Sequence, residues 1–525
     1  MMFTRRAVVA MLGSVAGATV AKALAAQTIG SGIRGEGMGA NAPYIPAAPP
    51  VPAGAPAVVS TPLGRLRGTE AEGVRYFRGV AYAKPPIGEL RFKHPQSIAP
   101  WDGVRDATRN PNAAPQIEVW NEAPGKSEDC LYLNIWAPST PGPHPVYVYV
   151  HGGGNVSGYA LEHRVDGAQF ARDGIVCVNV GYRLGLLGFV ELGHVLGPSY
   201  VGSGNNGLRD IIEALRWVRR CIAEFGGDPD NVTLGGQSAG AFNVVSLCAS
   251  PAADGLFHRA IVQSGSGHGI RSLADANASA ETLAREARAT GLAPLDWPAA
   301  PASDLIAFQA RALAYGSANG VIDNDILPGH PYQMAKWIGK AGRSLLIGYD
   351  RDEMSLFDAI GPEQLSADQK LAFERFRAMF ASGRIEHDMM SFRTAMTFGV
   401  PSLLFANAFA RSGGQVHVYE WNWAAASGPL AGKAFHGIEQ PFVWNTPRSI
   451  AFRGVDPAPD HAVLAERVHR RWCNFIRFGH PAARGAPDWP TWTPETCCVL
   501  TIDREDSIGT ATLMPTPWFA SHIAS

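Results

Sequence analysis

The sequence has almost no excess charge, no long apolar run in its body and no close cluster of metal-ligating residues. Its 525 residues include 45 Lys and Arg against 46 Asp and Glu, a formal net charge of -1. This balance argues against a nucleic-acid partner or an anionic membrane surface. No apolar run reaches the roughly 18 residues of a transmembrane helix, so we expect no stable membrane span in the mature chain. No Cys/His cluster has the spacing of a zinc site, and we expect neither a metal nor a cofactor.

The first 56 residues are not expected to belong to the fold. Arg5 and Arg6 precede an apolar stretch of small residues, and an Ala23-Leu-Ala25 cleavage pattern follows. We interpret residues 1–25 as a signal peptide for export to the periplasm or outside the cell, by the bacterial twin-arginine route or as an ordinary secretory peptide. Residues 26–56 are rich in Pro, Ala and Gly and are predicted to be disordered, because they cannot bury enough apolar surface to fold.

Residues 57–520 are predicted to form an α/β domain with a mostly parallel central sheet and helices on both faces. Continuous apolar runs indicate strands buried on both sides, and they alternate with amphipathic helical segments. The predicted buried strands are 146–150, 175–180, 232–234, 260–263, 344–348 and 416–421. Shorter antiparallel strands are predicted at 61–67, 74–82 and 131–136, and helices at 166–172, 208–225, 276–290, 303–318 and 462–478.

The pentapeptide Gly236-Gln-Ser-Ala-Gly240 matches the G-x-S-x-G pattern of a nucleophile elbow. A strand precedes it and an apolar helical pattern follows, which is the setting in which a serine sits at the tip of a strained strand-to-helix turn. The two glycines are needed where side chains would clash across the turn. The pattern therefore predicts Ser238 as a nucleophile; the plainer interpretation is a glycine-rich loop with a solvated serine.

A second glycine-rich loop, His151-Gly-Gly-Gly154, follows the predicted strand 146–150. Its backbone N–H groups could converge on a small anion without interference from side chains. Together with the N–H of Ala239, this is the layout of an oxyanion hole. An ordinary glycine-rich βα turn is the alternative for this loop taken alone.

The nucleophile needs a base and the base needs an acid. Of the 15 histidines, His436 follows strand 416–421 in a loop beside glycine, whereas His417 lies in that strand and is expected to pack. His469 is placed on a helix and His330 precedes a proline. The acid should follow strand 344–348, where spacing alone leaves three choices open, Asp350, Asp352 and Glu353.

With these motifs in fixed order, the chain resembles the type-B carboxylesterase family, which includes bacterial para-nitrobenzyl esterases, animal carboxylesterases and cholinesterases. The similar segments are 77–92, 127–136, 182–189, 225–234, 263–266, 351–357, 436–439 and 472–481, together with the elbow. The resemblance covers roughly residues 57–520 and implies an α/β-hydrolase fold in which helical cap insertions, at 268–325 and 355–412, line the gorge above the sheet.

The resemblance also implies a site and a reaction. It selects Glu353 as the acid, because the family's segment there resembles K-D-E-G-S, and His436 as the base. It assigns the oxyanion hole to Gly153, Gly154 and Ala239. The implied reaction is hydrolysis of a small carboxylic ester through an acyl-enzyme on Ser238, without a metal or cofactor.

The chain departs from the family pattern at three places. Gln237 stands where the family usually has glutamate, which should reduce support for the charged imidazole. Asn155 replaces an aromatic residue after the glycine triplet and could make the pocket more polar. Cys130 has no partner in the matching segment 114–116, so the family's early disulfide is expected to be absent.

Two other kinds of function remain open. The family fold also occurs in binding modules without catalysis, although those generally lose the nucleophile. A lipase- or amidase-like hydrolase is the other alternative, although no long amphipathic lid stands out. The sequence does not identify the ester or the oligomeric state.

Overall fold

The computed structural model describes residues 49–116, 123, 125–267, 269–312, 319–333, 342–360, 389–483 and 487–511. The predicted signal peptide, residues 1–25, lies outside the described residues, as does most of the segment 26–56. The first strand begins at Ala55, two residues before the predicted start of the domain.

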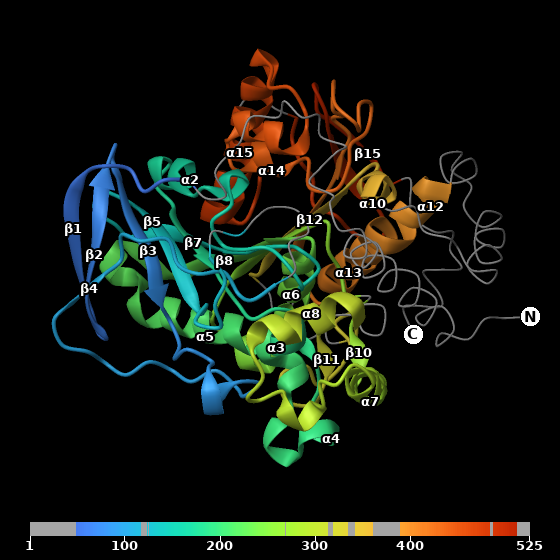
Figure 1. Cartoon of the computed structure of the whole chain (residues 1–525). Helices are drawn as coiled ribbons and strands as arrows, with labels where there is room; N and C mark the ends of the chain where they lie inside the picture. Colours follow the sequence, from blue (N-terminus) through green and yellow to red (C-terminus); the bar gives the residue numbers. More distant parts are fainter. Residues whose placement is uncertain are drawn as a thin grey trace, which may run out of the picture.

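The centre of the molecule is a twisted sheet of 13 strands among the described residues (Figure 1), in the order β1-β2-β3-β5-β7-β6-β8-β9-β12-β13-β14-β15, with β4 paired to β2. Every pairing from β7 to β14 is parallel, whereas β1, β2, β3, β5 and β7 pair antiparallel in turn, as do β14 and β15, and β4 runs parallel to β2. The strands are β1 (Ala55–Thr61), β2 (Gly64–Ala71), β3 (Val74–Ala81), β4 (Val104–Asp106), β5 (Tyr132–Pro138), β6 (His144–Val150), β7 (Val176–Val180), β8 (Gly227–Gln237), β9 (Arg259–Gln263), β12 (Ser344–Asp350), β13 (Gln415–Trp421), β14 (Cys498–Ile502) and β15 (Ser507–Thr510). A separate pair is β10 (Arg271–Ser272) and β11 (Val321–Ile322).

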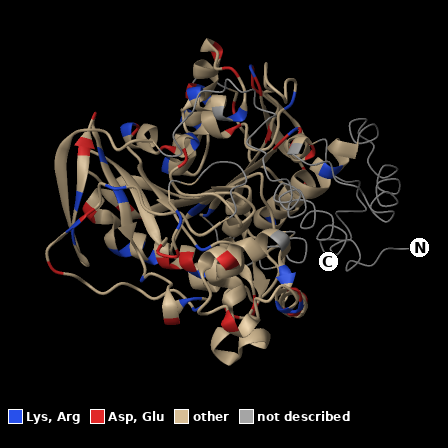
Figure 2. Ribbon diagram, in the orientation of Figure 1, with Lys and Arg blue, Asp and Glu red and all other residues tan. Residues whose placement is uncertain are grey.

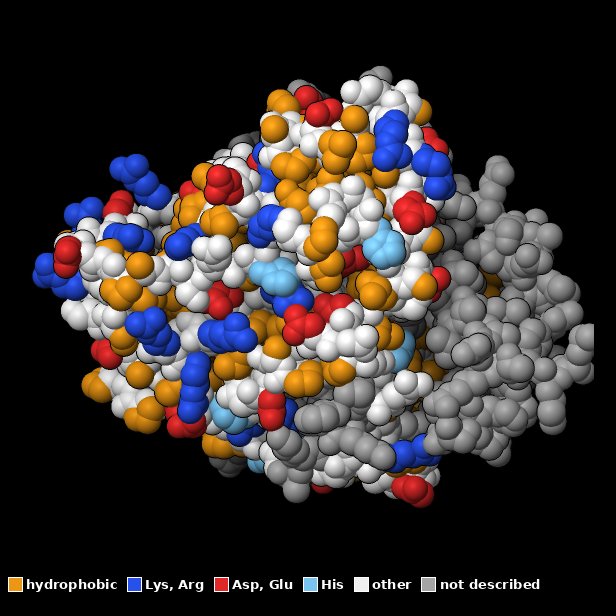
Figure 3. All heavy atoms as spheres, turned by 90° about the horizontal axis from the view of Figure 1, so that it is seen from below, with side chains coloured by type: hydrophobic (Ala, Val, Ile, Leu, Met, Phe, Trp, Pro, Cys, Tyr) orange, Lys and Arg blue, Asp and Glu red, His pale blue; other side chains and the backbone are white. Residues whose placement is uncertain are grey.

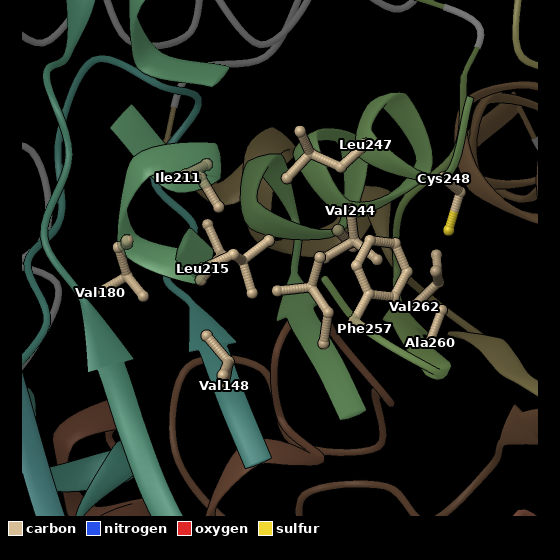
Figure 4. Packing of buried hydrophobic residues seen from close by; sticks show 14 of the residues in the cluster. Val148, Val180, Ile211, Leu215, Val244, Leu247, Cys248, Phe257, Ala260 and Val262 are labelled. Atoms are coloured by element: carbon tan, nitrogen blue, oxygen red, sulfur yellow. The ribbon is translucent and has the colours of Figure 1, made fainter. Parts of the chain in front are cut away.

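Helices cover both faces of this sheet. Along β6, Val146, Val148 and Val150 pack into the core beneath α5 and α6, and the alternate residues Tyr147 and Tyr149 pack into the core beneath α2, α14 and α15. Figure 4 shows side chains of α5 and α6 meeting those of the strands on the first face. Burying each such aliphatic side chain contributes about 1.5–3 kcal/mol. The helices are α2 (Ala168–Arg172), α3 (Gly185–Phe189), α4 (Gly193–Leu196), α5 (Asn206–Cys221), α6 (Ala239–Cys248), α7 (Leu273–Ala289), α8 (Ala302–Ala312), α10 (Met354–Ile360), α12 (Met389–Thr394), α13 (Val400–Arg411), α14 (Gln440–Val443) and α15 (Pro459–Phe478).

The mostly parallel sheet with helices on both faces confirms the predicted fold class. The predicted strand 61–67 begins too early, because Thr61 to Gly64 form the turn that joins β1 to β2 and β2 starts at Gly64. The hydroxyl of Thr61 accepts hydrogen bonds from the N–H groups of Leu63 and Gly64 there. The edge strands β14 and β15 were not predicted, and residues 313–318 of the predicted helix 303–318 lie outside the described residues.

The surface has no dominant sign of charge. Figure 2 shows basic and acidic residues interspersed along the ribbon, and Figure 3 shows the same mixture with apolar side chains on one face. In the part of the chain that the structure describes, no helix combines the length and apolar character needed to cross a membrane. All seven cysteine thiols are free, and Cys130 is buried.

Candidate active site

Ser238 lies at the sharp turn between β8 and α6. Its backbone has φ 56° and ψ -129°, a region that a residue with a side chain rarely adopts. The flanking glycines are required by close contacts, since a Cβ on Gly236 would lie 2.5 Å from the carbonyl carbon of Gly240 and one on Gly240 would lie 2.1 Å from the carbonyl oxygen of Val150. The local fold thus holds the Ser238 side chain at the carboxyl end of a central strand, as the elbow pattern predicts.

The loop after β6 lies directly against this turn. A Cβ on Gly152 would lie 2.9 Å from the Cβ of Ser238, and both residues line one pocket. Gly153 and Gly154 have φ values of 108° and 66°. Among the described residues, the backbone N–H groups of Gly153, Gly154 and Ala239 have no hydrogen-bond acceptor. These three donors are therefore available to a ligand at Ser238.

Asn155, by contrast, points away from the pocket. It is fully buried, and its side-chain oxygen accepts hydrogen bonds from the hydroxyl of Tyr182 and the amide of Asn243, at 3.0 and 2.8 Å. The expectation that Asn155 makes the pocket more polar is wrong, because the side chain instead ties the glycine loop to the core below it.

His436 is held between a carboxylate and an amide. Its Nδ1 lies 2.5 Å from Oε2 of the fully buried Glu353, and its Nε2 lies 3.3 Å from Nε2 of Gln237. The carboxylate places the proton on Nδ1, so the unprotonated Nε2 accepts a hydrogen bond from the Gln237 amide. Ser238 and His436 line the same pocket but are not hydrogen-bonded to each other within the described part of the chain.

All three carboxyl groups that the sequence left as candidates for the acid form hydrogen bonds that position the segment around His436. Asp352 accepts the N–H of Ala434 at 2.9 Å and pairs with Arg351. Asp350 accepts the N–H of Gly437 at 2.9 Å. Glu353 alone reaches the imidazole, and its second oxygen accepts the N–H of Asp350 at 2.9 Å. The three carboxyl groups thus fix the position of the histidine from both sides.

Asp350 is a neutral acid in this arrangement. Its complete burial, followed by the charges of Glu439 and Glu353, raises the pKa of Asp350 well above its usual range. Its Oδ1 and the Oε2 of Glu439 are both buried without an ordinary donor. A proton on Asp350 satisfies both atoms, because the carboxyl then donates to Glu439 while Oδ2 still accepts from Gly437.

The pocket has an apolar side and a polar side. The rings of Phe357 and Phe398 lie 5.1 and 5.0 Å from the ring of His436, and they come from the helical insertions. The empty volume of the pocket, open solvent included, is about 800 Å³. The pocket-lining residues are Gln116, Tyr149, His151, Gly152, Gly153, Gly154, Ser157, Gly158, Tyr159, Glu162, Arg164, Val165, Gln237, Ser238, Leu356, Phe357, His436, Gln440 and Arg453.

Sequence reasoning did not single out the polar wall formed by Glu162, Arg164, Gln440 and Arg453. These residues come from loops and short helices that precede α2 or follow His436, and no local motif marks them. The only sequence signal for a place in the pocket is that Gln440 and Arg453 follow the loop of His436 closely. Their positions depend on long-range packing, which a single sequence does not encode locally.

One cluster away from this pocket has metal-ligating atoms. Asp173, His469 and Cys473 each offer one atom, and the three atoms lie within 4.8 Å of one another. Nδ1 of His469 donates to the carbonyl of Val443 at 2.7 Å, and Nε2 lies 3.0 Å from Asp173. With both nitrogens facing acceptors, the ring is an imidazolium. Burial alone would lower its pKa, but interactions with Cys473, Asp173 and the Val443 carbonyl raise the pKa of His469 to about 10. A proton thus occupies the position that a metal would need.

Comparisons with known proteins cover nearly all of the described chain. A model of a family described as the carboxylesterase family matches residues 55–383 and 381–515. The para-nitrobenzyl esterase of Bacillus subtilis (strain 168) is 32% identical over 477 residues, which are 86% of this chain and 96% of that protein. The phenmedipham hydrolase of Pseudarthrobacter oxydans is 33% identical over 482 residues, 85% of this chain and 95% of that protein.

Solved structures match equally broadly. A PNB esterase superposes with a TM-score of 0.77 at 31% identity, covering 86% of this chain and 96% of its own. A carboxylesterase of Geobacillus stearothermophilus superposes with a TM-score of 0.76 at 33% identity, covering 89% of this chain and 99% of its own.

Proposed function

The chain belongs to the carboxylesterase family, and from this premise we propose that Ser238 is the nucleophile with which it hydrolyses carboxylic esters. The predicted resemblance to type-B carboxylesterases and the predicted α/β-hydrolase fold are confirmed by the same matches. The reaction class is that of a carboxylic ester hydrolase. What remains to be assigned is the part that each residue plays.

His436 acts as the base and Glu353 as its orienting acid. Nε2 of His436 exchanges the hydrogen bond from Gln237 for one from the Ser238 hydroxyl when an ester is bound, since such contacts often tighten only with substrate. The hydroxyl oxygen then attacks the ester carbonyl as its proton moves to Nε2. Glu353 stabilises the imidazolium through Nδ1, at 2.5 Å.

The tetrahedral intermediate places its negative oxygen among the N–H groups of Gly153, Gly154 and Ala239. Each such donor is commonly worth about 2.7–4 kcal/mol in the transition state. Collapse of the intermediate releases the alcohol, which takes the proton from Nε2. Water repeats the sequence on the acyl-enzyme, and the acid leaves.

The observation that supports this assignment best is the strained backbone of Ser238 beside three unbonded N–H groups, in one pocket with the His436–Glu353 pair. Such strain costs free energy that the surrounding fold must provide, and it is found where function needs it.

The experiment is hydrolysis of para-nitrophenyl acetate, butyrate and decanoate by the wild-type chain, Ser238→Ala and Ser246→Ala. Ser246 is a matched control on the same helix, where its buried hydroxyl donates to the carbonyl of Phe242. We expect turnover to vanish in Ser238→Ala and to remain in Ser246→Ala. Equal rates in wild type and Ser238→Ala would remove Ser238 as the nucleophile. A preference for decanoate, or for matched anilides, would instead favour a lipase- or amidase-like hydrolase.

We further propose that the mature protein is exported to the periplasm or secreted, because residues 1–25 have the features of a signal peptide. N-terminal sequencing of the protein recovered outside the cytoplasm should begin after Ala25. Replacing Arg5 and Arg6 with lysine should block export if the twin-arginine route is used, and unchanged export would identify an ordinary secretory signal.

A further inference from the structure

The pocket that contains Ser238 also contains a cation without a partner. Arg453 ends a 3-10 helix that spans Pro447–Arg453, and it lines the pocket together with Ser238 and His436. Among the described residues, its guanidinium forms neither a hydrogen bond nor an ion pair, and its Nε is fully buried. Burial of the guanidinium, followed by the charge of Arg164, lowers the pKa of Arg453 to about 9, so the group still bears its charge at neutral pH.

The acidic groups nearest Arg453 have other direct partners. Glu162 and Arg164 pair with each other. Glu439 lies behind the wall, where it accepts hydrogen bonds from Gln263 and Gln440, and Asp350 is neutral. The charges of Glu162 and Glu439 act on Arg453 from a distance, but among the described residues no carboxylate is in direct contact with its guanidinium. The partly buried guanidinium can therefore gain charge-assisted hydrogen bonds when an anion binds in the pocket.

Arg453 is also close to the reacting groups. A Cβ on Gly437, the residue after the proposed base, would lie 2.7 Å from Nη2 of Arg453 and 3.3 Å from Nε2 of Gln237. The Gln237 amide in turn touches His436. A substrate group that is held by the guanidinium therefore lies only a few bonds from an ester carbonyl at Ser238.

We propose that Arg453 binds a carboxylate of the substrate, so that this enzyme prefers carboxylic esters that bear a second, free carboxylate. A guanidinium recognises a carboxylate with two parallel charge-assisted hydrogen bonds, which gives orientation as well as affinity. Arg453 is thus a specificity-determining residue. The inference rests on the proposed function, because it presumes ester hydrolysis at Ser238.

The test compares two matched pairs of esters. In the first pair the charge is on the alcohol, in 3-carboxy-4-nitrophenyl acetate against 3-carbamoyl-4-nitrophenyl acetate. In the second it is on the acyl group, in monomethyl adipate against the methyl ester of adipic acid monoamide. The quantity measured is the preference, the ratio of kcat/KM for the charged ester to that for its neutral partner, in wild type, Arg453→Gln, Arg453→Lys and Arg448→Gln. Arg448 is the matched control, since it lies exposed on the same 3-10 helix.

In at least one pair, we expect a wild-type preference for the charged ester that falls about tenfold to a hundredfold in Arg453→Gln, mainly through KM, as for loss of a hydrogen bond to a charged group. Arg453→Lys should retain part of the preference, because the ammonium keeps the charge but lacks the two parallel N–H donors of the guanidinium. Arg448→Gln should retain all of the preference. If Arg453→Gln does not fold, the preference of Arg453→Lys is compared with that of wild type instead, and a reduced preference supports the proposal.

Two results would overturn the proposal. One is a wild-type enzyme with no preference for the charged ester in either pair. The other is an equal loss for both members of a pair in Arg453→Gln, which would make Arg453 structural. Failure of the proposed function looks different, because wild type would then hydrolyse none of the four esters or would hydrolyse them equally well as Ser238→Ala.

Discussion

Gln237→Glu should move the acid limb of the kcat–pH profile to higher pH. The side chain of Gln237 is almost completely buried, and its Nε2 lies 3.3 Å from Nε2 of His436. In wild type the amide donates to the unprotonated imidazole, the form that a general base requires. A carboxylate in its place cannot donate and instead favours the protonated ring. More of the enzyme is then in the inactive protonated form at any acidic pH.

The distance sets the size of the effect. Two unit charges about 4 Å apart interact by about 4 kcal/mol at the effective dielectric of a partly buried site. Desolvation of the new carboxylate offsets part of this energy. A neighbouring opposite charge at such a distance typically shifts a titration by about 1–3 pH units, and we expect the acid limb to move up by an amount in that range. Screening by salt should be weak because both groups are buried.

The assay is kcat for para-nitrophenyl butyrate from pH 5 to 9 in wild type, Gln237→Glu and Gln237→Met. The methionine variant is the control, because it has similar length, cannot donate and adds no charge. Its acid limb should move up by less than that of Gln237→Glu, because methionine removes the donor without adding a charge. Superimposable profiles of wild type and Gln237→Glu would show that the amide does not act on the base, and the description of His436 would then be wrong.

Three further predictions concern two carboxyl groups around the site and Asp173, which pairs with His469 of α15. Glu353→Gln should lower kcat by about 10³–10⁴-fold, because the imidazole loses the partner that fixes its tautomer; para-nitrophenyl acetate turnover checks this, and a loss below tenfold would assign the acid elsewhere. Asp350→Asn should leave the free energy of unfolding, measured with urea at pH 7, nearly unchanged, since the amide replaces a protonated carboxyl group atom for atom. Asp350→Ala should lower that free energy by about 1–3 kcal/mol, and equal losses in the two variants would mean that Asp350 is ionised. Asp173→Asn should cost about 1–2 kcal/mol at pH 6, and this difference from wild type should shrink as pH rises toward 10. The raised pKa of His469 gives stability that is complete below the unfolded value and lost as pH rises through about 10; a difference that does not depend on pH would contradict the ion pair.

The central strands and the strand-to-helix turn at Ser238 could be predicted from the sequence because their signals are local. Continuous apolar runs such as 146–150 identify strands buried on both faces, and the two glycines around Ser238 are demanded by contacts within a few residues. The choice of His436 over His417 also follows from local placement. His417 lies in β13, where burial lowers its pKa to about 4.

The remaining features could not be predicted because they depend on contacts between distant segments. Spacing did not separate Asp350, Asp352 and Glu353, and it did not indicate that all three hold the loop of His436. Nothing adjacent to Arg453 marks it as part of the pocket. The start of the predicted strand 61–67 was misplaced for a local reason, since Thr61 begins a turn that an alternating pattern of apolar residues conceals.

The most direct test of Ser238 as the nucleophile is the intact mass of the protein after reaction with diethyl para-nitrophenyl phosphate, followed by peptide mapping. The phosphoryl group transfers to an activated serine and stays there, because the imidazole is poorly placed to remove it. We expect one added diethylphosphoryl group, located on the peptide that contains Ser238 and absent in Ser238→Ala. An adduct on another residue, or the same adduct in Ser238→Ala, would contradict the assignment.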